Sequence, residues 1–157
     1  MRLPSICALT SIAAVLCTSQ ALAQDHEKKI NRSDLPAAVE KTVANHTAGA
    51  TIRGFNEEKE NGKTYYEAEL TVNGHSKDIL IDGAGAVAEV EEQIEFSSLP
   101  DAVQSGLQAK SGKGKIGKVE SITKHDKLVA YEAVVTAGGK RSEIQVGPDG
   151  KALDHEE

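Results

Sequence analysis

Leu35-Pro36-Ala37-Ala38-Val39 recurs 64 residues later as Leu99-Pro100-Asp101-Ala102-Val103, and this recurrence governs how the rest of the chain is interpreted. Further matches follow in the same order, at offsets of 64 and then 65 residues: Val43 with Leu107, Ile52 with Ile116, Tyr66-Glu67-Ala68 with Tyr131-Glu132-Ala133, Gly74 with Gly139, Ile79 with Ile144, Ile81 with Val146 and Gly85 with Gly150. Ordered matches over two whole segments are hard to obtain by chance. The sequence therefore predicts an internal duplication.

Each copy opens with a predicted amphipathic helix. In the first copy the stripe has the spacing of one helical face: Leu35, Ala38, Val39, Thr42 and Val43. Pro36 suits a first turn, because its missing N–H leaves no donor unsatisfied there. The second copy repeats the stripe with Gly106 in place of Thr42, which is expected to weaken that helix by about 1 kcal/mol relative to alanine.

After each helix the apolar period falls to two residues, which is typical of half-buried strands. Residues 65–72 alternate in this way, and Asn61-Gly62 and Asn73-Gly74 on either side predict hairpin turns. The second copy reads similarly and is predicted to end in a short strand over residues 151–154. The predicted fold class is α+β: two tandem repeats, each one helix packed on a four-stranded antiparallel sheet.

The first 23 residues have the features of a secretory signal peptide. Arg2 is followed by the apolar run 6–16, and Ala21-Leu22-Ala23 has the small-x-small form that signal peptidase recognises. Lipoprotein processing at Cys17 is disfavoured because Leu16 precedes it. The apolar run is too short for a retained membrane anchor.

The expected organisation follows from this boundary and from the duplication. We predict cleavage near Ala23 and a periplasmic or secreted location. A flexible tail is expected over residues 24–33, a first repeat over 34–95 and a second over 96–157. Without the signal, 17 basic and 24 acidic side chains remain, a formal charge of −7, and both cysteines are gone. This charge argues against nucleic acid and anionic membrane surfaces as partners.

No set of residues in the sequence predicts catalysis, a cofactor or a metal site. Residues 112–118 match the spacing of a phosphate-binding loop, but Val119 follows and a helix precedes the loop, which reverses the required order. The five histidines form no ligand pair. Glu91, Glu92 and Glu95 are expected to be a solvated strand end without apolar neighbours. The chain is predicted not to be an enzyme.

The sheet face opposite each helix is the candidate partner-binding surface. Its alternative is an ordinary solvated face, since single exposed apolar residues are common. An apolar character beyond that of a solvated face favours a protein-binding platform. The candidate residues are Tyr65, Glu67, Glu69, Leu80, Leu128, Glu132 and Val134.

Two segments carry a resemblance to a known family. Residues 66–70 (YEAEL) followed by 79–83 (ILIDG) resemble a PepSY-like unit, and residues 131–135 (YEAVV) with 148–151 (PDGK) repeat the pattern. The tandem arrangement also resembles that of the β-lactamase inhibitor protein. PepSY units occur in the pro-regions of thermolysin-type metallopeptidases and in envelope proteins, so the resemblance implies a role in binding or restraining peptidases. No peptidase domain is attached here, and no inhibitory-loop motif matches.

The expected function is therefore that of an exported, non-enzymatic protein-binding module. An envelope or secreted peptidase is the candidate partner, and inhibition or regulation of it the candidate activity. The alternative is a periplasmic sensor that binds a small ligand or a cation through its acidic strand ends. A purely structural envelope role is a third hypothesis.

Overall fold

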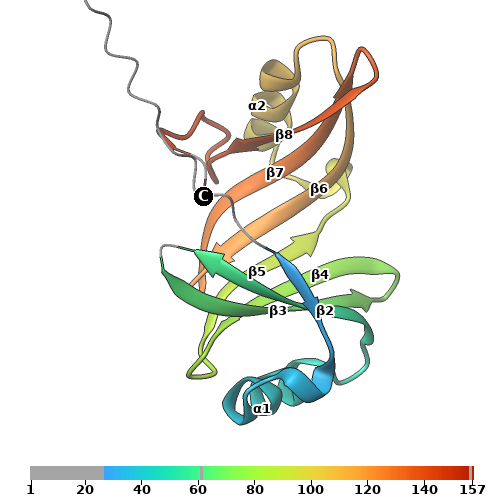
Figure 1. The fold of residues 1–157 in the computed structure, drawn as a ribbon. Helices are drawn as coiled ribbons and strands as arrows, with labels where there is room; N and C mark the ends of the chain where they lie inside the picture. The colour runs from blue at the N-terminus through green and yellow to red at the C-terminus, as the bar shows by residue number, and fades with distance from the viewer. Residues whose placement is uncertain (1–26, 61, 156) are drawn as a thin grey trace, which may run out of the picture.

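The computed structural model describes residues 27–157 apart from 61 and 156, so the predicted signal peptide lies outside the described residues. The described chain forms one antiparallel sheet of eight strands, in which each strand pairs with the next in sequence (Figure 1). The strands are β1 (Lys28–Ile30), β2 (Thr51–Glu60), β3 (Lys63–Val72), β4 (His75–Asp82), β5 (Val87–Gln93), β6 (Lys115–Lys124), β7 (Lys127–Ala137) and β8 (Lys140–Val146). The helices are α1 (Ala37–His46) and α2 (Asp101–Ser111). This confirms the α+β class and replaces two separate sheets with one.

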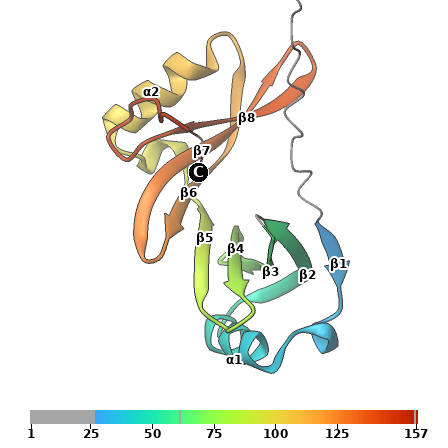
Figure 2. The same ribbon diagram turned by 60° about the vertical axis from the view of Figure 1, so that its left-hand side comes forward.

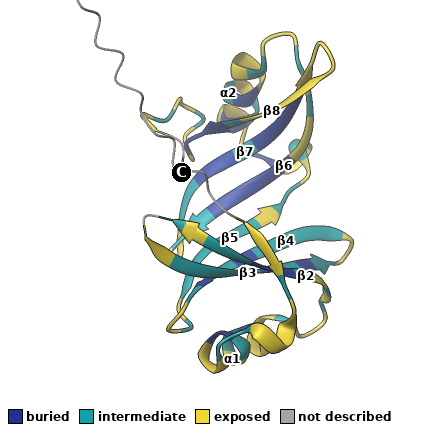
Figure 3. Cartoon of the chain, viewed as in Figure 1, coloured by how far each residue is buried: buried dark blue, intermediate teal, exposed yellow. Residues whose placement is uncertain are grey.

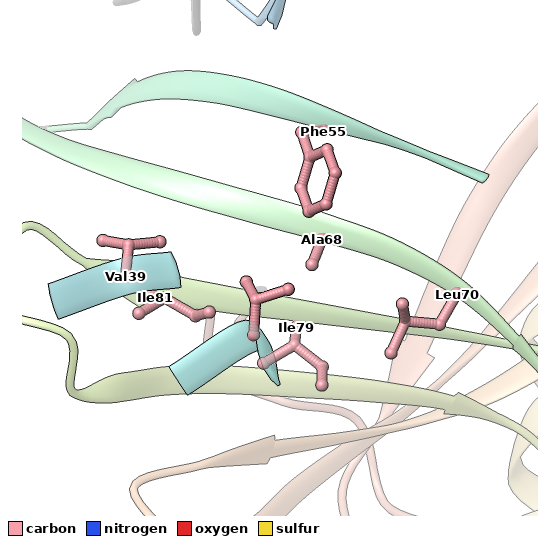
Figure 4. Packing of buried hydrophobic residues seen from close by; sticks show 7 residues of the cluster. Val39, Phe55, Ala68, Leu70, Ile79 and Ile81 are labelled. Carbon is pink, nitrogen blue, oxygen red and sulfur yellow. The ribbon is translucent and has the colours of Figure 1, made fainter. Parts of the chain in front are cut away.

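Each helix packs on its own half of the sheet through the predicted stripe. Val39 and Val43 of α1 lie in a cluster with Ile79 and Ile81 of β4 (Figure 4). In the other half, Val103 and Leu107 of α2 are fully buried and pack with residues of β6 to β8. Figure 2 shows the two helices at opposite ends of the molecule, each on the outer side of its half. A continuous sheet therefore carries two separate cores on its helix-covered face.

The second half contains three strands, not the four that were expected. Residues 151–154 are not a strand, although the Gly147 N–H still donates to the Lys151 carbonyl at 2.8 Å across the intervening turn. In the first half, β5 has hydrogen-bonding partners on both sides, β4 and β6. Among the described strands, residues 151–154 have only β8 as a possible neighbour.

The expected flexible tail over residues 24–33 contains a strand instead. Lys28, Lys29 and Ile30 pair with Glu57, Asn56 and Phe55 of β2 as strand β1. Ile30 also packs against the core beneath α1. One apolar side chain and one free sheet edge therefore order this segment, and a short polar sequence gave no periodicity from which to predict it.

Corresponding elements recur at the offset seen in the sequence. Gly85 and Gly150 both have a positive φ, and a Cβ added to either would meet the backbone carbonyl in the first turn of a helix, at Ala38 and at Ala102. In the same way, Tyr66 lies opposite Ile81 on the neighbouring strand, and Tyr131 lies opposite Val146. These correspondences agree with the predicted duplication, which stays a prediction.

Among the described residues, no helix combines the length and the apolar character that crossing a bilayer requires.

Candidate acidic face of the sheet

The face of the sheet turned away from the helices gathers carboxylates from successive strands. Strand register places Asp78 of β4 opposite Glu91 of β5, and Leu80 opposite Glu89. Glu89 in turn lies opposite Lys124 of β6. Residues that lie opposite one another in antiparallel strands point to the same side. Together with Glu58, Glu67, Glu69, Glu120 and Glu132, these carboxylates form one surface across the seam between the two halves, which we call the acidic face.

Six of the seven predicted partner-binding residues lie on this side of the sheet, and one does not. Alternation and register place Tyr65, Glu67, Glu69, Leu80, Glu132 and Val134 there. Leu128 is the exception. A register shift between Ile122 and Thr123 inserts Val129 into β7, and Leu128 consequently packs against the core beneath α2. The prediction for Leu128 was wrong because a β-bulge reverses the alternation.

The two halves differ in how much of this side is accessible. On β6 and β7 this side of the sheet carries Ile122 and Ala130, which are almost fully buried, and Val134, which is only 9 % exposed. Figure 3 shows these two strands as largely buried, whereas β3 to β5 are mainly intermediate. The accessible part of the acidic face therefore lies over β2 to β5 and the seam with β6.

A hollow of about 190 Å³ opens on the acidic face at this seam. Seven of its nine lining residues are acidic, with one lysine and one leucine: Glu58, Glu60, Glu67, Asp78, Leu80, Glu89, Glu91, Lys124 and Glu157. They come from β2 to β6 and from the C-terminal segment. Segments distant in sequence therefore concentrate negative charge in one concave place.

Partial burial changes the titration of these carboxyl groups. Loss of water raises the pKa of Glu91 to about 8, and the charges of Glu120 and Glu89 add to the effect. Burial, and then the charge of Glu67, raise the pKa of Glu58 to about 7. Burial is also the main cause of raised pKa values at Glu67, Asp78, Glu89 and Glu132. At neutral pH the acidic face thus holds protons that free carboxylates would have lost.

This environment overturns the expectation that Glu91 belongs to a solvated strand end. Glu91 lies opposite Asp78 on one side and opposite buried Ile122 on the other. Its sequence neighbour Glu92 points the other way, is half exposed and pairs with Lys77 at 2.6 Å. Alternation distinguishes the two glutamates, but the apolar neighbour of Glu91 is Ile122, which is 31 residues away in sequence.

Basic side chains neutralise only part of this charge. Arg53 pairs with Asp78 at 2.6 Å, and Lys118 pairs with buried Glu120 at 2.6 Å. Lys124 lies 3.5 Å from Glu89 and 3.7 Å from Glu157, so two carboxylates share one ammonium group. Arg53 and Lys118 stand at β-bulges, where one extra residue turns their side chains toward the acidic face. The charge that is left over attracts cations and basic groups.

Asn56 is a polar residue of the acidic face that sequence analysis missed. It lies on β2 opposite Glu67 and is 1 % exposed. Its Nδ2 donates to Glu67 Oε2 at 2.6 Å and contacts Glu69 Oε1 at 3.5 Å, while its Oδ1 has no hydrogen-bond partner. The alternation of β3 could have indicated Asn56. Glu67 and Glu69 lie on one face of β3, and the residue of β2 that lies opposite Glu67 belongs to the same face of the sheet.

The C-terminal segment reaches the same side of the sheet. Buried Gln145 accepts a hydrogen bond from the Glu157 N–H at 2.8 Å through Oε1. Its Nε2 donates to Glu132 at 2.9 Å. This contact brings Glu157 to the rim of the hollow.

Comparison with known proteins places this fold. No family model and no curated protein sequence matches the chain. Several solved structures are similar to it, among them three whose alignments each cover 76 % of this chain. A protein from Bacteroides eggerthii, provisionally assigned to the periplasm, matches with a TM-score of 0.61 and 16 % identity over 86 % of its chain. A DUF2874 family protein from Bacteroides ovatus matches at 0.60 and 17 % over 85 %. A BLIP-like protein from Bacteroides fragilis matches at 0.56 and 18 % over 83 %.

The chain has a BLIP-like fold. At these identities the likeness concerns the fold alone.

Proposed function

We propose that this chain is an exported, non-catalytic binding protein that receives a basic segment of another protein on its acidic face. Export rests on the signal-like residues 1–23 and on the periplasmic assignment of a protein with the same fold. The two halves, 34–95 and 96–157, are proposed to be PepSY-like repeats that together form one binding surface.

The hollow at the seam of the two halves is the observation that carries this proposal. Seven carboxylates surround it, and Lys124 is the one basic residue of its lining. Half-buried carboxylates of like charge are unfavourable for folding, because each loses water without gaining a full counter-charge. A lysine or arginine from a partner would supply that charge at a desolvated position. Charge complementarity of this kind favours fast association and a defined register.

An envelope or secreted peptidase is the proposed class of partner. The PepSY resemblance of residues 66–83 supports it, and so does the likeness in fold to a BLIP-like protein from Bacteroides fragilis. Under this proposal the partner inserts a basic loop between the two halves, and inhibition results from covering the partner's surface. No covalent chemistry is required of the chain.

Calorimetric titration of the purified protein with a decalysine peptide tests the charge-based recognition. At pH 8.5, where Glu58 and Glu91 are mostly ionised, binding should weaken at least tenfold in the double variant Glu58→Gln/Glu91→Gln and should fall steeply with salt. Glu92→Gln is the matched control, since Glu92 lies on the other face and is paired with Lys77. An equal loss of decalysine affinity in the double variant and in the control would contradict recognition through the acidic face.

The peptidase part needs a separate assay. A thermolysin-type metallopeptidase should lose activity on addition of the wild-type protein, and Glu58→Gln/Glu91→Gln should restore that activity. If decalysine binds but no envelope peptidase is inhibited, the proposal of a basic partner stands, and the proposal that this partner is a peptidase is contradicted.

A further inference from the structure

We propose that Glu27, Glu67 and Glu69, completed by the amide oxygen of Asn56, form a site for a hard divalent cation of the calcium class. One carboxylate oxygen from each of the three glutamates lies within 4.8 Å of the other two. Glu67 and Glu69 share one face of β3, and Glu27 immediately precedes β1 on the far side of β2. The site shares Glu67 with the hollow, but the proposal does not rest on partner binding.

The spacing of the oxygens suits a single ion. Calcium ligands lie at about 2.3–2.6 Å from the metal, so two ligands on opposite sides of one ion are about 4.8 Å apart. The three carboxylate oxygens are already within that limit, and each glutamate can approach further by rotating its side chain. The pairing of β1, β2 and β3 fixes the backbone positions from which they extend.

Asn56 gives the independent observation that points to a ligand. Its side chain is almost completely buried, its Nδ2 contacts both Glu67 and Glu69, and its Oδ1 has no hydrogen-bond partner. A buried carbonyl oxygen is nearly always satisfied in a folded protein, so an orphan demands an explanation. Asparagine side-chain oxygens are among the ligands that calcium takes. Turning the Asn56 amide by half a turn would bring Oδ1 to the place where Nδ2 now meets Glu67 and Glu69, and there a bound cation would supply the partner that Oδ1 lacks.

The balance of charge separates this group from the other acidic triad of the chain. Asp78, Glu91 and Glu120 are also close together, but Arg53 holds Asp78 and Lys118 holds Glu120. Within the described part of the chain, Glu27, Glu67 and Glu69 take part in no ion pair. Three uncompensated carboxylates suit a doubly charged ion, whereas a paired triad has its counter-charge already.

The donor atoms select the class of metal. All four side chains offer oxygen, and neither nitrogen nor sulfur takes part, so zinc and copper are disfavoured. Magnesium requires near-ideal octahedral geometry at shorter distances, whereas calcium accepts six to eight oxygens in flexible arrangements and uses bidentate carboxylates. Oxygen donors from β3, from β2 and from the exposed residue before β1 fit the flexible coordination of calcium better.

The ion would tie the edge strand to the sheet. β1 is three residues long and pairs only with β2, so its attachment is weak. A cation shared by Glu27 with Glu67 and Glu69 would link β1 to β3 across β2. Calcium is therefore expected to order the start of the folded chain.

Calorimetric titration of the chelator-treated protein with CaCl₂ tests the site, and terbium emission excited through tyrosine gives a second readout. Tyr65 is two residues from Glu67 on the same side of β3, and the chain has no tryptophan. We expect one calcium ion per chain, a higher Tm with CaCl₂ than with NaCl of equal ionic strength, and slower amide exchange at residues 28–30. The variant Glu69→Gln should weaken calcium binding at least tenfold.

The control is Glu143→Gln, an exposed carboxylate of β8 outside the site, which should bind calcium as the wild type does. Circular dichroism of Glu69→Gln without calcium checks that the variant is folded. The proposal is overturned by three results: no heat or Tm change at millimolar calcium, equal weakening in both variants, or magnesium binding as tightly as calcium.

Discussion

Asp78 and Glu91 lie directly opposite one another on adjacent strands, β4 and β5, on the side of the sheet that the helices leave uncovered. Two like charges in this position normally destabilise a sheet. Arg53 compensates Asp78 at 2.6 Å, but Glu91 has Ile122 as its other neighbour. Above about pH 8, where Glu91 is mostly ionised, this pairing is expected to weaken the fold, and both residues line the hollow.

Replacing Glu91 should therefore stabilise the protein. Glu91→Gln removes the like-charge contact and keeps the size of the side chain, so the free energy of unfolding at pH 8 should rise by about 1 kcal/mol. Glu92→Gln should instead change it by no more than about 0.5 kcal/mol, because Glu92 is half exposed. Urea denaturation of the two variants measures both values. A loss of stability in Glu91→Gln would contradict the electrostatic interpretation.

Stability should increase as the pH falls from 8.5 to 5.5. The pKa values of Glu91 and Glu58 are raised in the folded protein to about 8 and about 7, from 4.5. Between the unfolded and folded values the folded state binds more protons, so lowering the pH favours folding. After discounting for solvent screening, we expect about 1 kcal/mol, or a Tm about 4 °C higher at pH 5.5. Thermal melts at constant ionic strength decide this, and a Tm that rises with pH would refute it.

Gly150 should tolerate substitution far less than Gly139. Both have a φ of 78°, but an added Cβ at Gly150 would strike the carbonyl of Ala102 in α2, whereas Gly139 has open space. The shared backbone strain costs about 1 kcal/mol in each alanine variant. The steric contact should bring the cost of Gly150→Ala to about 3 kcal/mol. Chemical denaturation of both variants measures the difference, and equal losses would mean that the turn does not press on the helix.

Sequence analysis anticipated the elements and part of the acidic face. Helical and strand periodicities are local, so the stripe through Val39 and Val43 and the alternation of residues 65–72 predicted α1 and β3 well. The recurrence of Leu35-Pro36 at Leu99-Pro100 predicted the second helix, which begins at Asp101, directly after the proline. These features depend on neighbours within a few residues.

What sequence analysis missed depends on contacts between distant strands. Leu128 changed sides because of a bulge in β7, which no residue type signalled. Glu91 lost its expected solvation because β6 places Ile122 beside it. The strand β1 formed because β2 offered a free edge. Asn56 entered the acidic face through its register with Glu67, and register becomes known only with the fold.

An amide chemical-shift titration of the ¹⁵N-labelled protein with decalysine tests the central claim most directly. We predict shifts concentrated at Leu80, Glu89, Glu91 and Lys124, around the hollow at the seam, which diminish in Glu58→Gln/Glu91→Gln. Shifts confined to α1 and α2, or no shifts at millimolar peptide in low salt, would contradict recognition of basic partners by the acidic face.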